Sequence, residues 1–178
     1  LHVKSGEANL VDLDISSSEG RYLIDSGATL GLDYESDHTI SAPIEGEGRL
    51  VKKGDFDLRL AGTNSYSGGT EIKSGKLLGD LDSLSSAGDI VVEKDAVLSF
   101  EDTDDHTFHL FSNFVSGEGK VVKEGSHTLQ ISSSGGLEHD GGIEIRGGDG
   151  SRLLGDTDTI SGNISVGGAA RLELSQGA

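Results

Sequence analysis

Apolar residues in this chain fall in short runs in which every second position is apolar. A period of two places one face of an extended segment in a core and the other face in water, as in a half-buried β-strand. Glycine, serine, asparagine and aspartate separate the runs and favour turns, and no window of about eleven residues shows a helical period. The pattern predicts an all-β chain, with strands at Val11-Leu13-Ile15, Ala28-Leu30-Leu32, Phe56-Leu58-Leu60, Ile90-Val92, Ala96-Leu98-Phe100, Leu129-Ile131, Ile143-Ile145, Ile164-Val166 and Leu172-Leu174.

The chain also repeats itself along the sequence. Residues 46–54 (GEGRLVKKG) return as residues 117–125 (GEGKVVKEG), a shift of 71. Residues 28–32 anticipate residues 96–100 in the same way, at a shift of 68. Internal repeats are typical of solenoids, in which each unit packs only on its neighbours. We therefore expect one segment, 1–178, of about two and a half copies: a partial copy at 1–45 and further copies at 46–116 and 117–178.

The number of short strands in one unit indicates several coils of a parallel β-helix. At roughly 20–25 residues a coil, a unit holds about three coils and the chain about seven. The equivalent apolar residues of successive coils would then form one continuous core. The competing fold is an antiparallel sandwich or barrel, whose hairpins favour Asn-Gly or Asp-Gly turns. Asp-Gly occurs only at Asp140-Gly141 and Asp149-Gly150, and Asn-Gly is absent, so the sequence favours the parallel β-helix.

Composition alone gives a different indication, because low hydrophobicity with high net charge is typical of disordered chains. Only 33% of the residues are apolar and the formal net charge is −17, but the regular alternation of the apolar residues predicts a folded chain. The charge disfavours nucleic acid and anionic lipid as partners. The absence of cysteine excludes disulfides, thiolate zinc sites and a cysteine nucleophile.

The chain shows no targeting or membrane segment of its own. No apolar run reaches the roughly 20 residues of a membrane helix, so we expect no direct membrane insertion. No basic region followed by an apolar stretch marks a signal peptide. Because the sequence starts at Leu1, we expect a fragment of a larger precursor.

One stretch of the sequence resembles a known family. Residues 48–54 (GRLVKKG), 58–60 (LRL), 62–70 (GTNSYSGGT) and 76–79 (KLLG) are similar to the passenger-associated strand repeat of bacterial autotransporters, as in adhesins of the AIDA type. The second copy is degenerate, because residues 132–142 keep only the Gly-Gly and have no tyrosine at the equivalent place. We interpret the motif as structural, with glycines for a tight turn, a flat apolar ring and an asparagine cap; its residues are Asn64, Tyr66, Ser67, Gly68, Gly69 and Thr70.

The resemblance implies a fold and a location. It implies a right-handed parallel β-helix that is secreted across the outer membrane of a Gram-negative cell. It also implies an extracellular, cell-surface position, held by an outer-membrane translocator that this chain does not contain. The missing cysteines agree with secretion of a chain without disulfides.

Two short motifs suggest proteases, and the sequence argues against both. Asp25-Ser26-Gly27 is similar to the loop of a retroviral-type aspartic protease, which needs two carboxylates from a dimer. The internal repeat aligns it with residues 93–95, an ordinary turn before a strand. Residues 148–151 (GDGS) resemble a serine-protease motif but lack the Asp-Ser-Gly order, and nothing identifies His127 or His139 as the base.

Acidic residues offer two further chemistries, polysaccharide cleavage and calcium binding. Sugar sites favour exposed aromatic rings, and the chain has only eight aromatic residues. Since His106 and His109 lie three apart on an expected strand, they face opposite sides and cannot share a metal ion. We therefore expect solvated turn acids and no catalytic, cofactor or metal site. The acids are the pairs Asp80 with Asp82 and Asp156 with Asp158 and the cluster Glu101, Asp102, Asp104 and Asp105; the phenylalanines predicted to lie in the core are Phe56, Phe100, Phe108, Phe111 and Phe114.

These observations lead to a hypothesis of a non-enzymatic adhesin. Its partner is either a host cell-surface or matrix component, or a second copy of the chain. In the second case the repulsion between chains of charge −17 must be offset by basic residues that face acids of the other copy. The alternatives are a polysaccharide-degrading β-helix enzyme and a passive stalk. The basic residues that we expect to face the other copy are Arg49, Lys52, Lys53 and Lys73.

Overall fold

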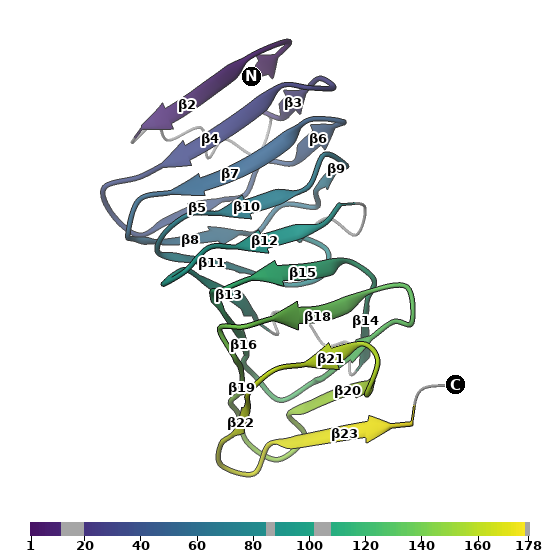
Figure 1. The fold of residues 1–178 in the computed structure, drawn as a ribbon. Helices are drawn as coiled ribbons and strands as arrows, with labels where there is room; N and C mark the ends of the chain where they lie inside the picture. Colours follow the sequence, from purple (N-terminus) through teal and green to yellow (C-terminus); the bar gives the residue numbers. More distant parts are fainter. Residues whose placement is uncertain (12–19, 85–87, 102–107, 177–178) are drawn as a thin grey trace.

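The computed structural model describes residues 1–11, 20–84, 88–101 and 108–176. This part of the chain consists of strands joined by turns, and it contains no helix that could cross a membrane. The strand pairings are parallel, and the turns stack as a solenoid with the two termini at opposite ends (Figure 1). The predicted all-β parallel β-helix of about seven turns is confirmed, and the antiparallel alternative is wrong.

Three sides enclose the core, and the chain passes them in a fixed order. The first side is an eight-stranded sheet. Its strands, in stacking order, are β2 (Glu7–Val11), β4 (Thr29–Asp33), β7 (Arg49–Lys53), β10 (Thr70–Ile72), β12 (Ile90–Val92), β15 (Phe114–Gly117), β18 (Gly136–His139) and β21 (Ile160–Ser161). The second side is a seven-stranded sheet of β5 (His38–Ile40), β8 (Asp57–Leu60), β11 (Lys76–Gly79), β13 (Val97–Phe100), β16 (Lys120–Lys123), β19 (Ile143–Ile145) and β22 (Ile164–Val166).

The third side consists of two four-stranded sheets, whose strands lie along the chain between the second side of one turn and the first side of the next. One belongs to the N-terminal half and contains β1 (His2–Val3), β3 (Tyr22–Ile24), β6 (Ile44–Gly46) and β9 (Ser65–Tyr66). The other belongs to the C-terminal half and contains β14 (Phe108–Phe111), β17 (Thr128–Ile131), β20 (Arg152–Asp156) and β23 (Arg171–Ser175).

Stacked side chains of successive turns form the core. On the first side, residues 20 to 25 positions apart lie above one another, which agrees with the predicted coil length. Phe100 and Phe111 add an edge-to-face ring contact with centroids 4.9 Å apart. The first-side column runs through Leu50, Thr70, Ile90, Val115, Leu137 and Ile160, all of them buried.

The sequence repeat does not equal a whole number of turns. Three turns from Leu50 end at Val115, a shift of 65 along the chain. The repeat copy of Leu50 is Val121, which follows Val115 at a further shift of 6 and lies on β16 of the second side. Likewise β4 lies on the first side and its repeat copy β13 on the second. One repeat therefore spans three turns plus one side, so its copies face different directions.

Two phenylalanines that the sequence predicts in the core are exposed instead. Phe56 (47% exposed) lies in the corner directly before β8. Phe114 (44%) begins β15 on the outward face, stacked beside Gly136. Phe56 precedes its strand and is outside the alternation, whereas Phe114 follows the alternation of β15 on the face opposite the buried Val115.

The strands at the two ends of the rod carry three further exposed residues from the predicted core. Val11 (57% exposed) points outward because β2 buries Leu10, so that run is out of register by one residue; Leu13 and Ile15 lie outside the described residues. Val166 (44%) and Leu174 (42%) lie on β22 and β23, which end their sheets and have no following turn to cover them.

The corner glycines provide a test of how closely successive turns approach. A Cβ on Gly48 would lie 2.7 Å from the carbonyl oxygens of both Asp25 and Ala28, whereas a Cβ on Gly148 would meet no atom within 4 Å. We expect Gly48→Ala to lower the free energy of unfolding by about 1–3 kcal/mol, because the backbone of the preceding turn must move. Gly148→Ala should change it by less than about 0.5 kcal/mol. Urea unfolding followed by circular dichroism measures both, and equal effects would contradict the close approach.

Candidate functional site

Asn64 of the passenger-like motif lies buried between three successive turns. Its Oδ1 accepts a hydrogen bond from the Ile44 N–H at 2.8 Å, and its Nδ2 donates to the Ser83 carbonyl. The Asn64 N–H in turn donates to the carbonyl of Asp82 at 3.1 Å. One side chain thus satisfies the backbone of the turn before it and of the turn after it, at a corner where the strands themselves cannot pair.

The rest of the motif forms the corner between β9 and β10. Tyr66 is 1% exposed, and its hydroxyl hydrogen-bonds to the Thr70 Oγ1 at 2.6 Å; burial raises the pKa of Tyr66 to about 12. Gly69 has a φ of +87°, and a Cβ on Gly68 would lie 2.4 Å from the carbonyl oxygen of Gly48. Ser67 and Gly68 are the exposed members of the motif. The contacts of the other motif residues lie within the fold.

His139 occupies the position of Tyr66 in the second copy of the repeat. The Gly-Gly pairs of the two copies align at a shift of 73, which matches Tyr66 with His139 and Thr70 with Ile143. His139 is also buried, at 4% exposed, but the isoleucine offers no hydroxyl, and no described side chain pairs with its ring nitrogens. Burial lowers the pKa of His139, against smaller opposing effects of the Gly119 backbone and Asp140.

Two lysines at equivalent places in the repeat are buried. Lys52 is 2% exposed, and its ammonium group donates to the carbonyls of Lys53, Gly54 and Ser74 at 3.0, 2.5 and 2.9 Å. Lys123, its copy at a shift of 71, is also 2% exposed and donates to the Glu124 carbonyl. Burial lowers the pKa of Lys52, while Asp55, Asp57 and Asp33 act in the opposite direction. The expectation that Lys52 faces a second copy is therefore wrong, because its charge stabilises a corner.

On the first side, the other predicted basic residues pair with acids of this chain. Glu71 lies between the Arg49 Nη1 at 3.5 Å and the Lys73 Nζ at 3.4 Å. Lys53 contacts both Glu7 and the Asn9 Oδ1, the latter at 2.8 Å. We name the group of Arg49, Glu71 and Lys73 the first triad.

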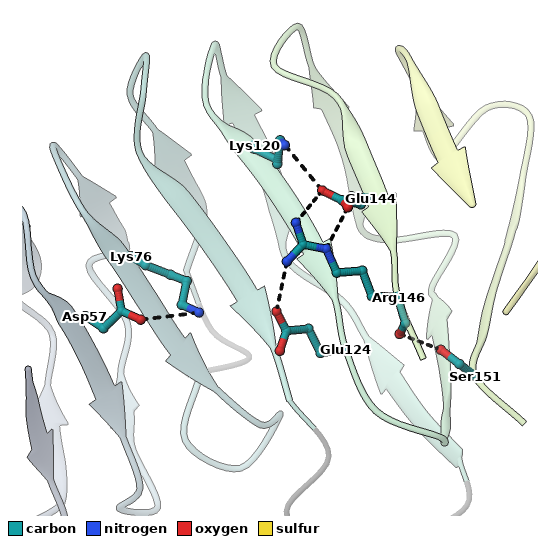
Figure 2. A network of polar contacts seen from close by, with 7 residues as sticks. All are labelled: Asp57, Lys76, Lys120, Glu124, Glu144, Arg146 and Ser151. Carbon is teal, nitrogen blue, oxygen red and sulfur yellow. Dashed lines mark hydrogen bonds and ion pairs between the residues drawn. The ribbon is translucent and has the colours of Figure 1, made fainter. Parts of the chain in front are cut away.

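The second side carries the repeat copy of this group (Figure 2). Glu144 accepts from the Arg146 Nε at 2.6 Å and lies 3.3 Å from the Lys120 Nζ. The Arg146 Nη1 also lies 3.6 Å from Glu124, and Arg146 and Lys120 lower the pKa of Glu144, Arg146 most strongly. We name the group of Lys120, Glu144 and Arg146 the second triad.

Each triad borders a shallow groove at the corner before its sheet. The first groove, about 280 Å³, lies next to Arg49, and the second groove, about 210 Å³, lies next to Lys120. The lining residues of the two grooves are equivalent in the repeat, at shifts of 68, 71 and 73. Those of the first are Gly27, Ala28, Thr29, Glu47, Gly48, Arg49 and Gly68, and those of the second are Asp95, Ala96, Val97, Glu118, Gly119, Lys120 and Gly141.

The two protease-like motifs form ordinary turns. The Asp25 carbonyl accepts from the Ala28 N–H at 2.9 Å, as the Glu93 carbonyl does from Ala96 at 3.0 Å, so the repeat alignment of these two turns is confirmed. The Asp25 side chain pairs with His2 at 2.7 Å. Ser151 is fully buried, and its hydroxyl donates to the Arg146 carbonyl at 3.1 Å. The Asp25 carboxylate and the Ser151 hydroxyl, which the two chemistries would need, each have a partner within the fold.

One acid of each predicted pair caps a turn. The Asp80 Oδ1 accepts from the Ser83 N–H at 2.8 Å, and the Asp156 Oδ1 accepts from the Thr159 N–H at the same distance. These turns are repeat copies at a shift of 76. Asp158 also donates its N–H to the Asp156 carboxylate at 3.0 Å. The geometry is that of an aspartate turn cap.

The acidic cluster is described only at Glu101, which contacts Arg59 of β8. Among the residues that the structure describes, no three His, Cys, Asp or Glu side chains gather as metal ligands do. Outside the described residues lie Asp102, Asp104, Asp105 and His106, together with the side chains of Phe108 and His109.

Sequence reasoning missed the triads and one further corner residue. The triads have a sequence signal, because Glu71-x-Lys73 returns as Glu144-x-Arg146 at a shift of 73. Asn113 has no such signal. It is buried, and its Nδ2 donates to the Gly88 carbonyl, as Asn64 does at its own corner. Only the stacking of turns brings such positions together.

Comparison with known proteins gives the following relatives. The family model described as passenger-associated-transport-repeat matches residues 50–78, which run from β7 to β11 and include the Asn64–Thr70 motif. The chain is 31% identical over 191 aligned residues to the adhesin BmaC autotransporter of Brucella suis biovar 1 (strain 1330). That alignment covers 97% of this chain and 5% of the adhesin. No solved structure matches the chain.

The bridging role of Asn64 predicts a specific loss of stability. Asn64→Ala leaves the buried Ile44 N–H without its acceptor, so we expect the free energy of unfolding to fall by about 1–3 kcal/mol. Ser67→Ala, in the same motif but exposed, should change it by less than about 0.5 kcal/mol. Chemical denaturation of the two variants tests the interpretation of the motif as structural, and a stable Asn64→Ala protein would refute it.

His139 predicts a pH-dependent stability. Its pKa is lowered in the folded chain, so between that value and the unfolded value of about 6.5 the unfolded state binds more protons. Stability therefore falls as the pH drops below about 6.5, by at most about 1.4 kcal/mol per pH unit from this group. The double variant His139→Tyr, Ile143→Thr, which rebuilds the Tyr66–Thr70 pair, should lose this contribution.

Unfolding at pH 7.5 and at pH 5.5 compares the double variant with the parent chain. Ile143→Thr alone retains the histidine and serves as the control, since it should keep most of the parent's pH dependence. If all three proteins lose the same stability between the two pH values, His139 is not the group responsible.

Proposed function

This chain belongs to the bacterial autotransporter passenger family, and we propose that it acts there as a non-enzymatic adhesive rod. Passengers of this family are exposed at the cell surface or secreted. In our proposal the chain is held at the surface by a translocator outside this sequence. Its partner is a host cell-surface or matrix component or a second copy of the chain.

One observation carries the proposal. The similarity to the BmaC autotransporter, which is named an adhesin, extends over 97% of this chain at 31% identity. The similarity therefore includes the corners and the outward faces as well as the short repeat at residues 50–78. Because the chain spans only 5% of that adhesin, adhesion by this particular segment is our inference.

The use of the polar residues supports a non-enzymatic role. Asp80 and Asp156 cap turns, and Ser151 donates to a backbone carbonyl. These three residues, which belong to the motifs that suggested hydrolysis of glycans or peptides, thus have structural partners. What remains available at the surface is a set of outward charges on regular strands, which fits binding along a face better than turnover in a cleft.

Adhesion can be measured with the purified chain on fluorescent beads. We expect the beads to bind cultured host cells, surfaces coated with extracellular matrix proteins, or other beads that carry the same chain, at physiological salt. Beads that carry the thermally unfolded chain are the control for fold, because nonspecific attraction to a charge of −17 survives unfolding. Binding to none of these surfaces would favour a passive stalk, and release of sugars from a glycan panel would favour the enzyme.

A further inference from the structure

The two grooves share one acid–cation pair on different sides of the rod, and the second groove also contains Asp95 where the first has Gly27. In each, a glutamate precedes a cation by two residues: Glu47 and Arg49 in the first groove, and Glu118 and Lys120 in the second. The Arg49 and Lys120 side chains are 45% and 47% exposed although each already contacts a triad glutamate. Their remaining N–H groups are therefore accessible to another molecule.

A pattern of one acid and one cation is complementary to itself. If two copies of the chain meet at this groove about a two-fold axis, Glu47 faces the second copy's Arg49 and Arg49 faces the second copy's Glu47. The same holds for Glu118 and Lys120. Most of the other lining residues are glycine or alanine, with Thr29 in the first groove and Asp95 and Val97 in the second as the larger members.

We propose that the two grooves are equivalent contacts between copies of this chain. The proposal rests on the self-association branch of the proposed function. Since one repeat spans three turns plus one side, the first groove lies at the corner before the first side and the second at the corner before the second side. A chain with two self-complementary patches in different orientations binds two partners, so the assembly continues beyond a dimer instead of closing.

Charge-changing variants test the proposal, because the groove contact and general electrostatic repulsion predict opposite changes in association. Glu47→Arg and Glu118→Arg together change the net charge from −17 to −13, since each exchange adds two positive charges. General repulsion between chains then decreases, which by itself favours association. Our proposal predicts the reverse, because each introduced arginine replaces the acid that would face Arg49 or Lys120 of the second copy and so places two cations opposite each other.

Sedimentation velocity of the purified chain, at concentrations up to about 1 mM for a weak contact, distinguishes these possibilities. We expect the parent chain to form species larger than dimers as its concentration rises. Glu47→Arg alone and Glu118→Arg alone should stop at dimers, and the double variant should remain monomeric. The control variant Glu138→Arg, Asp149→Arg reaches the same charge of −13 through exposed acids outside the grooves and should associate at least as well as the parent.

The outcomes separate this inference from the proposed function. If the parent chain and the double variant each self-associate to the same extent, the groove contact is wrong but self-association still holds. If the parent chain stays monomeric throughout, self-association and the groove contact both fail, while bead binding to host surfaces still tests adhesion. Circular dichroism of every variant ensures that a loss of association is not a loss of fold.

Discussion

Parallel pairing between successive turns is the constraint on which the rest of the structure depends. Each turn lies about 4.8 Å from the next, and its strands donate and accept hydrogen bonds on both edges. Any residue that breaks this spacing at a corner disturbs the turns on either side. The glycines at 48, 68, 119 and 141 follow from this, because a Cβ at each would lie within 3 Å of backbone atoms of the preceding turn.

The same constraint explains how the polar residues are used. Strands satisfy their own backbone, but corners leave carbonyls and N–H groups that no strand reaches. Asn64, Lys52 and Asp80 supply these partners at three kinds of corner. A lysine with its charge buried is stable here because three carbonyl oxygens surround the ammonium group, which replaces the water that it loses.

The sequence predicts the strands and the class of fold because alternation and turn residues report directly on burial. Of the core set, Leu30, Leu58 and Leu98 are each at most 1% exposed, as their runs require. The prediction for Phe56 is wrong because a run cannot show where its strand begins, and that for Phe114 because its own strand buries the next residue, Val115. The burial of Lys52 and the partners of Asn64 depend on parts of the chain one turn away. Because the length of a turn varies along the rod, the sequence does not show which residues lie one turn apart.

Since the repeat and the turn have different lengths, the position of a feature around the rod depends on the copy that carries it. Each copy advances the triad by one side, as Glu71 and Glu144 show. A third copy would bring it to the remaining side, and a fourth, about ten turns from the first, would restore the original direction. A longer rod built from this unit would therefore carry its triads along a helical path about its axis. Its surface would be similar from every direction of approach, whatever the rotation of the rod on the cell.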